Sequence, residues 1–407
     1  KMPHVRSVSL AFFIGAGGCY ETAGQSGISH FVEHVCFKGT QKRRTSKEIS
    51  EAIEGTGGMI NGGTDKELTL YWCRVASKHL ELAVDVLADI LRNSRFDHAD
   101  IDKERRVIIE EINMNYDSPQ QRVDALLYEL LWPDQPAGRD VAGFKNTVQG
   151  FDRVALYNFY EQHYAPGNMV ISVAGDIDTG QLVELLDKSF HDWSPVTPGS
   201  RPENVSLQAE PRVKLEYRDI EQVQLSLGFH GLSLMHPDRF AVDLLNVILG
   251  DGMSSRLFLE VREKYGLAYD IGSGVDHFLD VGDLTVHAGI DPARINQALK
   301  IILQQLHAIK SDVSEEELVR AKELVKGRLF LSMESPHGVS NWHGAQEILT
   351  GKILDVDEIT ALVDAVNVDD LNRVGGELIK AEKLNLAVVG PIKDESGLRH
   401  VFEDLKL

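Results

Sequence analysis

Basic residues are in short supply in this sequence, and that shortage narrows the range of partners. Against 62 aspartates and glutamates there are 42 lysines and arginines, which leaves a formal net charge of −20. Nucleic acids and anionic membrane surfaces attract proteins through clustered positive charge. We therefore expect neither as a partner, and among peptides an acidic protein favours basic ones.

Cysteines and long apolar runs are also scarce. Cys19, Cys36 and Cys73 are odd in number and stand far apart, which suits a reducing compartment better than a disulfide framework. No apolar run approaches the roughly 20 residues of a transmembrane helix, and no signal-peptide pattern is visible. These absences favour a cytoplasmic protein, of bacterial type, without a membrane segment.

The length and a cluster of prolines indicate two domains. A chain of 407 residues exceeds the size of one typical core. Four of the 13 prolines gather between Trp193 and Val213 among polar residues, which is typical of a linker. We predict a first domain over residues 1–194, a linker over 195–212 and a second domain over 213–407.

The two halves repeat one another. SVSLAFFI from Ser7 aligns with QVQLSLGF from Gln222, and VAGD from Val173 aligns with VVGP from Val388; both offsets are 215 residues. Residues 8–13 have the pattern of a strand, and long periodic helices follow the strands in each half. The repeat predicts two copies of one α/β unit.

Residues 30–34 read HFVEH and carry the strongest chemical signal. On a helix, His30 and His34 lie one turn apart on the same face, so both imidazoles can converge on one metal ion. Glu33 then lies beside them, where a carboxylate can take a proton from a water that zinc has activated. Because a catalytic zinc normally takes three protein ligands, a third must be found.

A charged amphipathic helix is predicted over residues 100–116, and it supplies the candidates. Glu104 and Glu111 are seven residues apart, about two turns, and so share a face. Glu110 points about 100° away from Glu111 and is the poorer candidate. In isolation, a solvated charged face is the better interpretation of either glutamate.

With these residues the chain resembles the pitrilysin and mitochondrial processing peptidase family of inverted-motif zinc peptidases. In that family His-x-x-Glu-His is followed about 75 to 80 residues later by a glutamate, and here His34 and Glu111 are 77 residues apart. The segments GISHFVEHVCFKGT, GGMINGGTDKELTLY, VLADILRNSRFD and FYEQHYAPGNMVISVAGDID extend the resemblance over nearly the whole chain. The family usually has a strand and turn before the segment that starts KMPHVRSVSL here, so we expect a native N-terminus upstream, where an export signal stays possible.

The resemblance implies a site and a fold. His30, His34 and Glu111 would bind one zinc ion per chain, Glu33 would be the general base, and Glu104 would orient the ligands from behind. The implied fold is α/β (α+β): two tandem homologous domains, each a mixed, largely antiparallel sheet packed with helices, forming half of a clam-shaped chamber. Two such halves close around the substrate, so a homodimer is implied, with a heterodimer as the alternative.

The second half lacks the metal ligands but carries another family segment. At the offset of 215, apolar residues stand opposite the metal motif: Leu245, Ile248 and Leu249. The segment SSRLFLEVREKYGLAYDI contains Arg262 and Tyr269, which the resemblance assigns to the substrate and the developing oxyanion. The alternative is a surface arginine and a core tyrosine.

The segment GGMINGGTDKELTLY resembles the edge strand that receives an extended peptide. Asn61 would lie at its centre. Family members commonly have alanine and then a bulkier residue after this asparagine, whereas Gly62 and Gly63 follow here, which predicts a more flexible strand.

The sequence thus predicts a zinc metalloendopeptidase that hydrolyses peptides or presequence-like segments. Two alternatives remain: a non-catalytic scaffold subunit like the core proteins of the respiratory complex, and a peptidase dedicated to maturing one peptide precursor. The scaffold is disfavoured because such relatives typically lose metal ligands or the general base. Here all four residues are present: His30, Glu33, His34 and Glu111.

Overall fold

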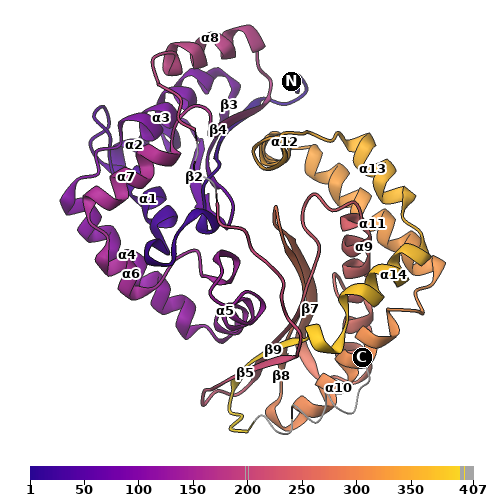
Figure 1. Ribbon diagram of the computed structural model, residues 1–407. Coiled ribbons are helices and arrows are strands. Elements are labelled where there is room, and N and C mark those ends of the chain that lie inside the picture. Colours follow the sequence, from indigo (N-terminus) through magenta and orange to yellow (C-terminus); the bar gives the residue numbers. More distant parts are fainter. Residues whose placement is uncertain (198, 200, 395–397, 399–407) are drawn as a thin grey trace. The chain divides into compact units, whose positions relative to one another are not determined.

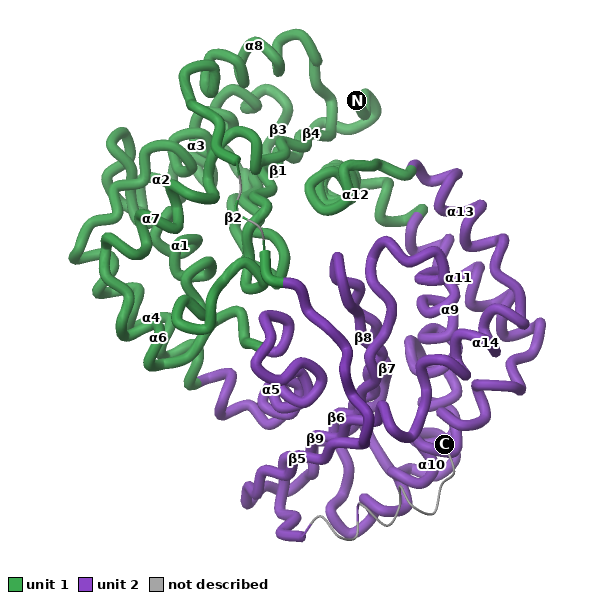
Figure 2. Tube along the Cα trace, in the orientation of Figure 1, with its two compact units in different colours: residues 1–113, 139–202, 330–354 green, residues 114–138, 203–329, 355–407 purple. Residues whose placement is uncertain are grey.

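The computed structural model describes residues 1–197, 199, 201–394 and 398. They form two compact units, coloured separately in Figure 2. Unit 1 comprises residues 1–113, 139–202 and 330–354, and unit 2 comprises residues 114–138, 203–329 and 355–407. The chain passes from unit 1 to unit 2 after Pro202, inside the predicted linker of residues 195–212.

Unit 1 is built on an antiparallel sheet of four strands in the order β2-β3-β1-β4 (Figure 1). The strands are β1 (Ser7–Ile14), β2 (Met59–Thr64), β3 (Thr69–Ala76) and β4 (Met169–Gly175). Helices of this unit are α1 (Ile28–Cys36), α2 (Ser46–Glu54), α3 (Leu80–Asn93), the part of α4 (His98–Asp117) up to residue 113, α6 (Lys145–Gly150), α7 (Arg153–His163), α8 (Thr179–Phe190) and α12 (Pro336–Thr350).

Strand β1 lies in the interior of this sheet, and both of its faces are covered. Leu10 and Phe12 belong to the apolar core that also takes residues of α1 and α3. Ser9, on the other face, accepts a hydrogen bond at 2.9 Å from the hydroxyl of Ser340 in α12. Burial on both faces explains why the strand reads as an almost continuous apolar run.

Unit 2 has a five-stranded sheet in the order β5-β9-β6-β8-β7, in which only β5 and β9 pair in parallel. Its strands are β5 (Arg212–Tyr217), β6 (Val223–His230), β7 (Ala268–His277), β8 (Gly282–Ile290) and β9 (Asn385–Gly390). Its helices are α5 (Pro119–Leu131), α9 (Arg239–Leu249), a π-helix at Phe258–Lys264, α10 (Ile295–Ala308), α11 (Glu315–Met333, up to residue 329), α13 (Val356–Ala365) and α14 (Val368–Leu378). The prediction of two largely antiparallel sheets packed with helices is confirmed, and the sheet of unit 2 is mixed as predicted, whereas that of unit 1 is antiparallel throughout.

The repeat is visible in the order of the elements. Helices α3 and α10 begin 295 − 80 = 215 residues apart, and α7 and α14 begin 368 − 153 = 215 residues apart. The offset read from short sequence matches therefore also relates whole helices.

Each unit takes one helix from the other half of the sequence. Helix α12 packs on β1 and β4 of unit 1, and α5 packs on β6 and β9 of unit 2. The predicted division into 1–194 and 213–407 follows chain order, whereas the compact units exchange these two helical segments. Periodicity shows that a helix has an apolar face but not which sheet covers it.

Each exchanged helix packs on its sheet through a contact between a glycine and a large apolar residue, and the glycine is on the helix in one unit and on the strand in the other. In unit 1 a Cβ at Gly344 of α12 would overlap the Phe13 ring of β1. In unit 2 a Cβ at Gly228 of β6 would lie 3.1 Å from a methyl carbon of Leu127 of α5. Phe13 and Gly228 are equivalent at the 215-residue offset, so the large residue is on the strand in one unit and on the helix in the other. This complementarity disfavours the unexchanged packing.

Candidate metal centre

Helix α1 carries the HFVEH motif, and a buried carboxylate holds its first turn. The helix follows Gly27, whose φ of 93° is in the left-handed region that glycine adopts without strain. Glu21 accepts hydrogen bonds from the backbone N–H of Gly27 at 2.8 Å and of Ser29 at 2.9 Å. Burial raises the pKa of Glu21 to about 7, although both backbone donors favour its ionised form. These bonds fix the direction in which α1 leaves the preceding loop.

The two histidines converge as the helical spacing predicts. The Nε2 atoms of His30 and His34 lie 3.1 Å apart. Burial, and then the neighbouring His34, lower the pKa of His30 to about 4, so this imidazole is neutral near pH 7 and its lone pair is available to a metal.

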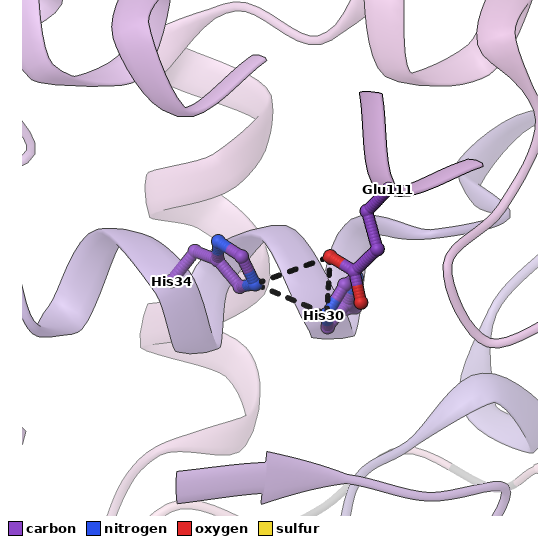
Figure 3. A group of neighbouring side chains, drawn as sticks. All are labelled: His30, His34 and Glu111. Carbon is purple, nitrogen blue, oxygen red and sulfur yellow. Dashed lines mark hydrogen bonds and ion pairs between the residues drawn. The ribbon is translucent and has the colours of Figure 1, made fainter. Parts of the chain in front are cut away.

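The carboxylate of Glu111 on α4 closes the group, as Figure 3 shows. Its Oε2 lies 3.7 Å from His30 Nε2 and 3.8 Å from His34 Nε2. Among the described residues this is the one trio of His, Cys, Asp or Glu side chains found close enough to hold a metal ion. Glu110 is exposed on the same helix.

The trio fits a zinc ion in donor chemistry and in spacing. Two histidines and one carboxylate are a known set for catalytic zinc. Two nitrogens bound to one tetrahedral zinc at about 2.05 Å lie about 3.3 Å apart, close to the separation of the two Nε2 atoms here. Three protein ligands leave a fourth position for water.

Glu104 supports one histidine from behind. Its Oε2 lies 3.1 Å from Nδ1 of His34, and its Oε1 lies 3.0 Å from Nζ of Lys38. Burial opposes ionisation of Glu104, but the hydrogen bonds from His34 and Lys38 outweigh it and lower its pKa. An ionised Glu104 accepts the Nδ1 proton of His34 and leaves Nε2 free for the metal.

Glu33 lies beside the trio and is held by a threonine. Its side chain is buried, and its Oε2 accepts a hydrogen bond at 3.0 Å from Thr64 Oγ1 at the end of β2. Burial raises the pKa of Glu33, and the nearby Glu111 acts in the same direction, whereas His34 and Thr64 oppose the shift. A carboxylate with a raised pKa is a better proton acceptor.

The three strand residues singled out from the sequence lie on different faces of β2. Gly62 faces Glu33: a Cβ there would lie 3.0 Å from Glu33 Oε1 and 2.8 Å from the ring of Phe37. Asn61 and Gly63 are exposed, and a Cβ at Gly63 would meet nothing within 4 Å. The glycine at 62 is therefore explained by close approach to the carboxylate, beyond the predicted flexibility.

Arg262 and Tyr269 contact each other within unit 2. Arg262 Nη1 donates to the backbone oxygen of Tyr269 at 2.9 Å, and its guanidinium lies 4.6 Å from the centre of the Tyr269 ring. A bulge between Ala268 and Ile271 interrupts the pairing of β7 there, and Tyr269 is 78% exposed. The alternative of a core tyrosine is wrong, while the predicted role toward the substrate remains a prediction.

Three residues near the trio were not singled out from the sequence: Glu21, Lys38 and Thr64. Lys38 lies one turn beyond His34, and that spacing could have pointed to it. Glu21 and Thr64 come from a loop and a strand, where no periodicity relates them to the motif.

Comparison with known protein families matches both halves. The profile described as "Insulinase (Peptidase family M16)" matches residues 1–144, and the one described as "Peptidase M16 inactive domain" matches residues 150–325. An uncharacterized zinc protease of Streptomyces coelicolor is 35% identical over 405 residues, which cover 98% of this chain and 88% of that relative. This chain belongs to the M16 peptidase family.

Two solved structures share the fold of this M16 chain. A protease from Helicobacter pylori superposes with a TM-score of 0.89 at 23% identity, covering 95% of each chain. A chain of complex III2 from Candida albicans superposes with a TM-score of 0.83 at 18% identity, covering 99% of this chain and 95% of that one. The fold is thus shared by proteins of different kinds, and at these identities the likeness concerns the fold alone.

The second half has the apolar residues expected opposite the metal motif. Leu245, Ile248 and Leu249 are buried in α9 and leave no ligand there. None of the helices in the described part of the chain is both long and apolar enough to cross a membrane.

Proposed function

We propose that this chain is a zinc metalloendopeptidase that hydrolyses peptides or presequence-like segments. The observation that carries the proposal is the convergence of His30, His34 and Glu111 on one point beside a buried carboxylate, Glu33. Zinc, when bound, lowers the pKa of a coordinated water and polarises a carbonyl. Family membership supports the same reading.

Glu33 handles the proton in this proposal. Its carboxylate accepts a proton from the attacking water and then delivers it to the nitrogen of the leaving amine. Thr64 donates to one carboxylate oxygen at 3.0 Å, and Gly62 lies close to the other, so the side chain is held from two sides. Burial, which raises the pKa of Glu33, strengthens it as a base for this transfer.

Strand β2 provides a place for the peptide. It is the last strand of its sheet, so its outer edge can pair with an extended substrate through main-chain hydrogen bonds. Such pairing depends little on side chains and suits an enzyme that accepts varied peptides. Asn61, exposed in the middle of β2, faces a peptide bound there.

Arg262 and Tyr269 are proposed to donate hydrogen bonds to substrate and to the developing oxyanion from the second subunit of a cytoplasmic homodimer. Mixing a Glu33→Gln subunit with a Tyr269→Phe subunit tests this. Shared sites predict recovery of activity in the mixed dimer, because one of its two sites then has both residues intact. Inactive mixtures, despite demonstrated subunit exchange, would contradict the trans arrangement.

The main proposal is tested with wild type and Glu33→Gln. Both are assayed on a quenched peptide library, and bound zinc is quantified in each. We expect the wild type to cleave and the variant to keep zinc but lose at least about 1,000-fold in kcat, as a base and proton carrier is removed. Zinc-loaded wild type that cleaves no peptide would refute the proposal.

A scaffold subunit is the second candidate, because the fold also occurs in a chain of complex III2. The complete trio and Glu33 argue against it, since a scaffold needs none of these residues. A peptidase that matures one precursor would share the whole site, and library profiling separates it from a general peptidase by the number of sequences cleaved.

A further inference from the structure

A cavity of about 370 Å³ lies at the beginning of β2, at the opposite end of that strand from Thr64. Two arginines line it, Arg6 and Arg74, together with Met59 and Gly57. All of these residues belong to unit 1. No role in the proposed hydrolysis has been assigned to either arginine.

The arginines come together through the sheet. Arg74 is the cross-strand partner of Met59 in the pairing of β3 with β2. Arg6 stands just before β1, and its backbone oxygen accepts a hydrogen bond at 3.1 Å from Ser77 N, just after β3. Strand pairing thus brings two residues 68 positions apart in sequence to one cavity (74 − 6 = 68).

Neither guanidinium has an ion-pair partner among the described residues, and both arginines are exposed. Arg43, by contrast, has carboxylate partners: it donates to Asp89 at 2.8 Å and to Asp85 at 2.5 Å. A guanidinium without such a partner can donate charge-assisted hydrogen bonds to the carboxylate of a ligand.

The cavity includes a residue of the edge strand along which the peptide is proposed to lie. Gly62 is next to Glu33, and Met59 is three residues back along β2, which is about 10 Å at the rise of a strand. In a peptide that pairs with the edge of β2, each residue lies opposite one residue of the strand. A peptide residue about three to five positions from the scissile bond therefore lies opposite Met59, whose cross-strand partner on the next strand is Arg74.

We propose that Arg6 and Arg74 form a subsite for a carboxylate of the bound peptide. The carboxylate can belong to an aspartate or glutamate side chain, or to the C-terminus of the peptide. The inference rests on the proposed function, because it assumes that substrate lies along β2. It also refines the expectation of basic peptides: an acidic group is favoured at one position of the substrate.

The test measures binding on Glu33→Gln protein loaded with zinc, so that peptides are held without being cut. Fluorescent peptides carry a single glutamate at successive positions, each paired with its glutamine counterpart, and a second set carries a free or an amidated C-terminus. We expect about fivefold tighter binding of the acid at one position only, the value for a charged hydrogen bond reduced by solvent screening. The glutamate set identifies a side chain as the source, and the second set identifies a terminus.

Adding Arg74→Gln or Arg6→Gln to this protein should abolish the difference between acid and amide. Arg44→Gln is the matched control, because Arg44 is also exposed in unit 1 but does not line the cavity. Should Arg74→Gln fail to fold, Arg74→Lys must retain part of the preference, and the preference of the unchanged arginines must fall with added salt. Equal binding of acid and amide at every position, or an equal effect of Arg44→Gln, would overturn the subsite.

Wild-type cleavage distinguishes the two proposals. If the wild type cleaves peptides but no position prefers an acid, only the subsite is wrong. If binding shows the preference while the wild type cleaves nothing, the subsite stands and the peptidase assignment falls.

Discussion

Replacement of Glu104 by glutamine should weaken zinc binding without removing any ligand. Glu104 accepts from His34 Nδ1 at 3.1 Å and pairs with Lys38 at 3.0 Å, and it is 6% exposed. Glutamine preserves the volume but carries no charge, and its NH₂ group cannot accept from Lys38. Either the amide turns its oxygen to His34 and faces Lys38 with a donor, or it does the reverse.

In both orientations His34 loses the charged hydrogen-bond partner of its Nδ1. The expected loss of zinc affinity is therefore that of removing a charged partner from a metal-binding histidine. Such partners are worth about 10- to 100-fold in metal affinity, or about 1.4 to 2.7 kcal/mol. We expect the lower half of that range, because the amide still accepts one hydrogen bond and because His30, whose buried Nδ1 has no partner among the described residues, is unaffected.

The assay is competition for zinc with a chromogenic chelator, on wild type, Glu104→Gln and Glu110→Gln. Glu110 is the matched control: it is exposed on the same helix and loses the same charge. Far-UV circular dichroism of each metal-free protein checks the fold. If Glu104→Gln binds zinc within twofold of the wild type, or if Glu110→Gln loses as much affinity, the support of His34 by Glu104 is refuted.

Three further predictions concern close packing and one ion pair. Gly62→Ala should lower kcat about tenfold by displacing Glu33, whereas Gly63→Ala, which has open space, should change it less than twofold; equal effects of the pair on peptide hydrolysis would contradict this. Gly344→Leu should destabilise the protein by about 3 kcal/mol in chemical unfolding through overlap with Phe13, and adding Phe13→Ala should recover part of that loss. The pKa of Glu317 is lowered to about 2: burial opposes this, but hydrogen bonds from Arg256 at 2.7 Å and from Ser314 outweigh it. A pKa lowered on folding stabilises the fold above pH 4.5, and this stabilisation is lost as the pH falls toward 2. Glu317→Gln should therefore lower the free energy of unfolding by about 1 to 2 kcal/mol at pH 7, after solvent screening, and by progressively less below pH 4.5. A loss of stability that does not change with pH would contradict this prediction.

Local spacing was enough to predict that the two histidines of the motif converge. His30 and His34 converge because helical geometry relates residues four apart whatever surrounds the helix. The same geometry favoured Glu111 over Glu110, and the structure places Glu111 with the histidines. The pairing of this helix with α1 came from the family resemblance, since nothing local relates residues 77 positions apart.

Other features could not be read from the pattern. The close approach of Gly62 to Glu33 and the hydrogen bond from Thr64 join a strand to a helix. Glu21 reaches α1 from a loop, and its carboxylate has no motif that distinguishes it from the chain's other acids. Each contact depends on how separate elements pack.

The exchange of α5 and α12 shows most clearly which features follow from the sequence and which depend on tertiary packing. The amphipathic spacing of each helix and the 215-residue repeat are properties of the sequence, since they depend only on which residues recur at which intervals. Which sheet each helix covers depends on the fit of side chains from distant segments, such as Phe13 against Gly344 and Leu127 against Gly228. The hydrophobic effect favours burying an apolar face but does not select the surface that buries it, and shape complementarity makes that selection.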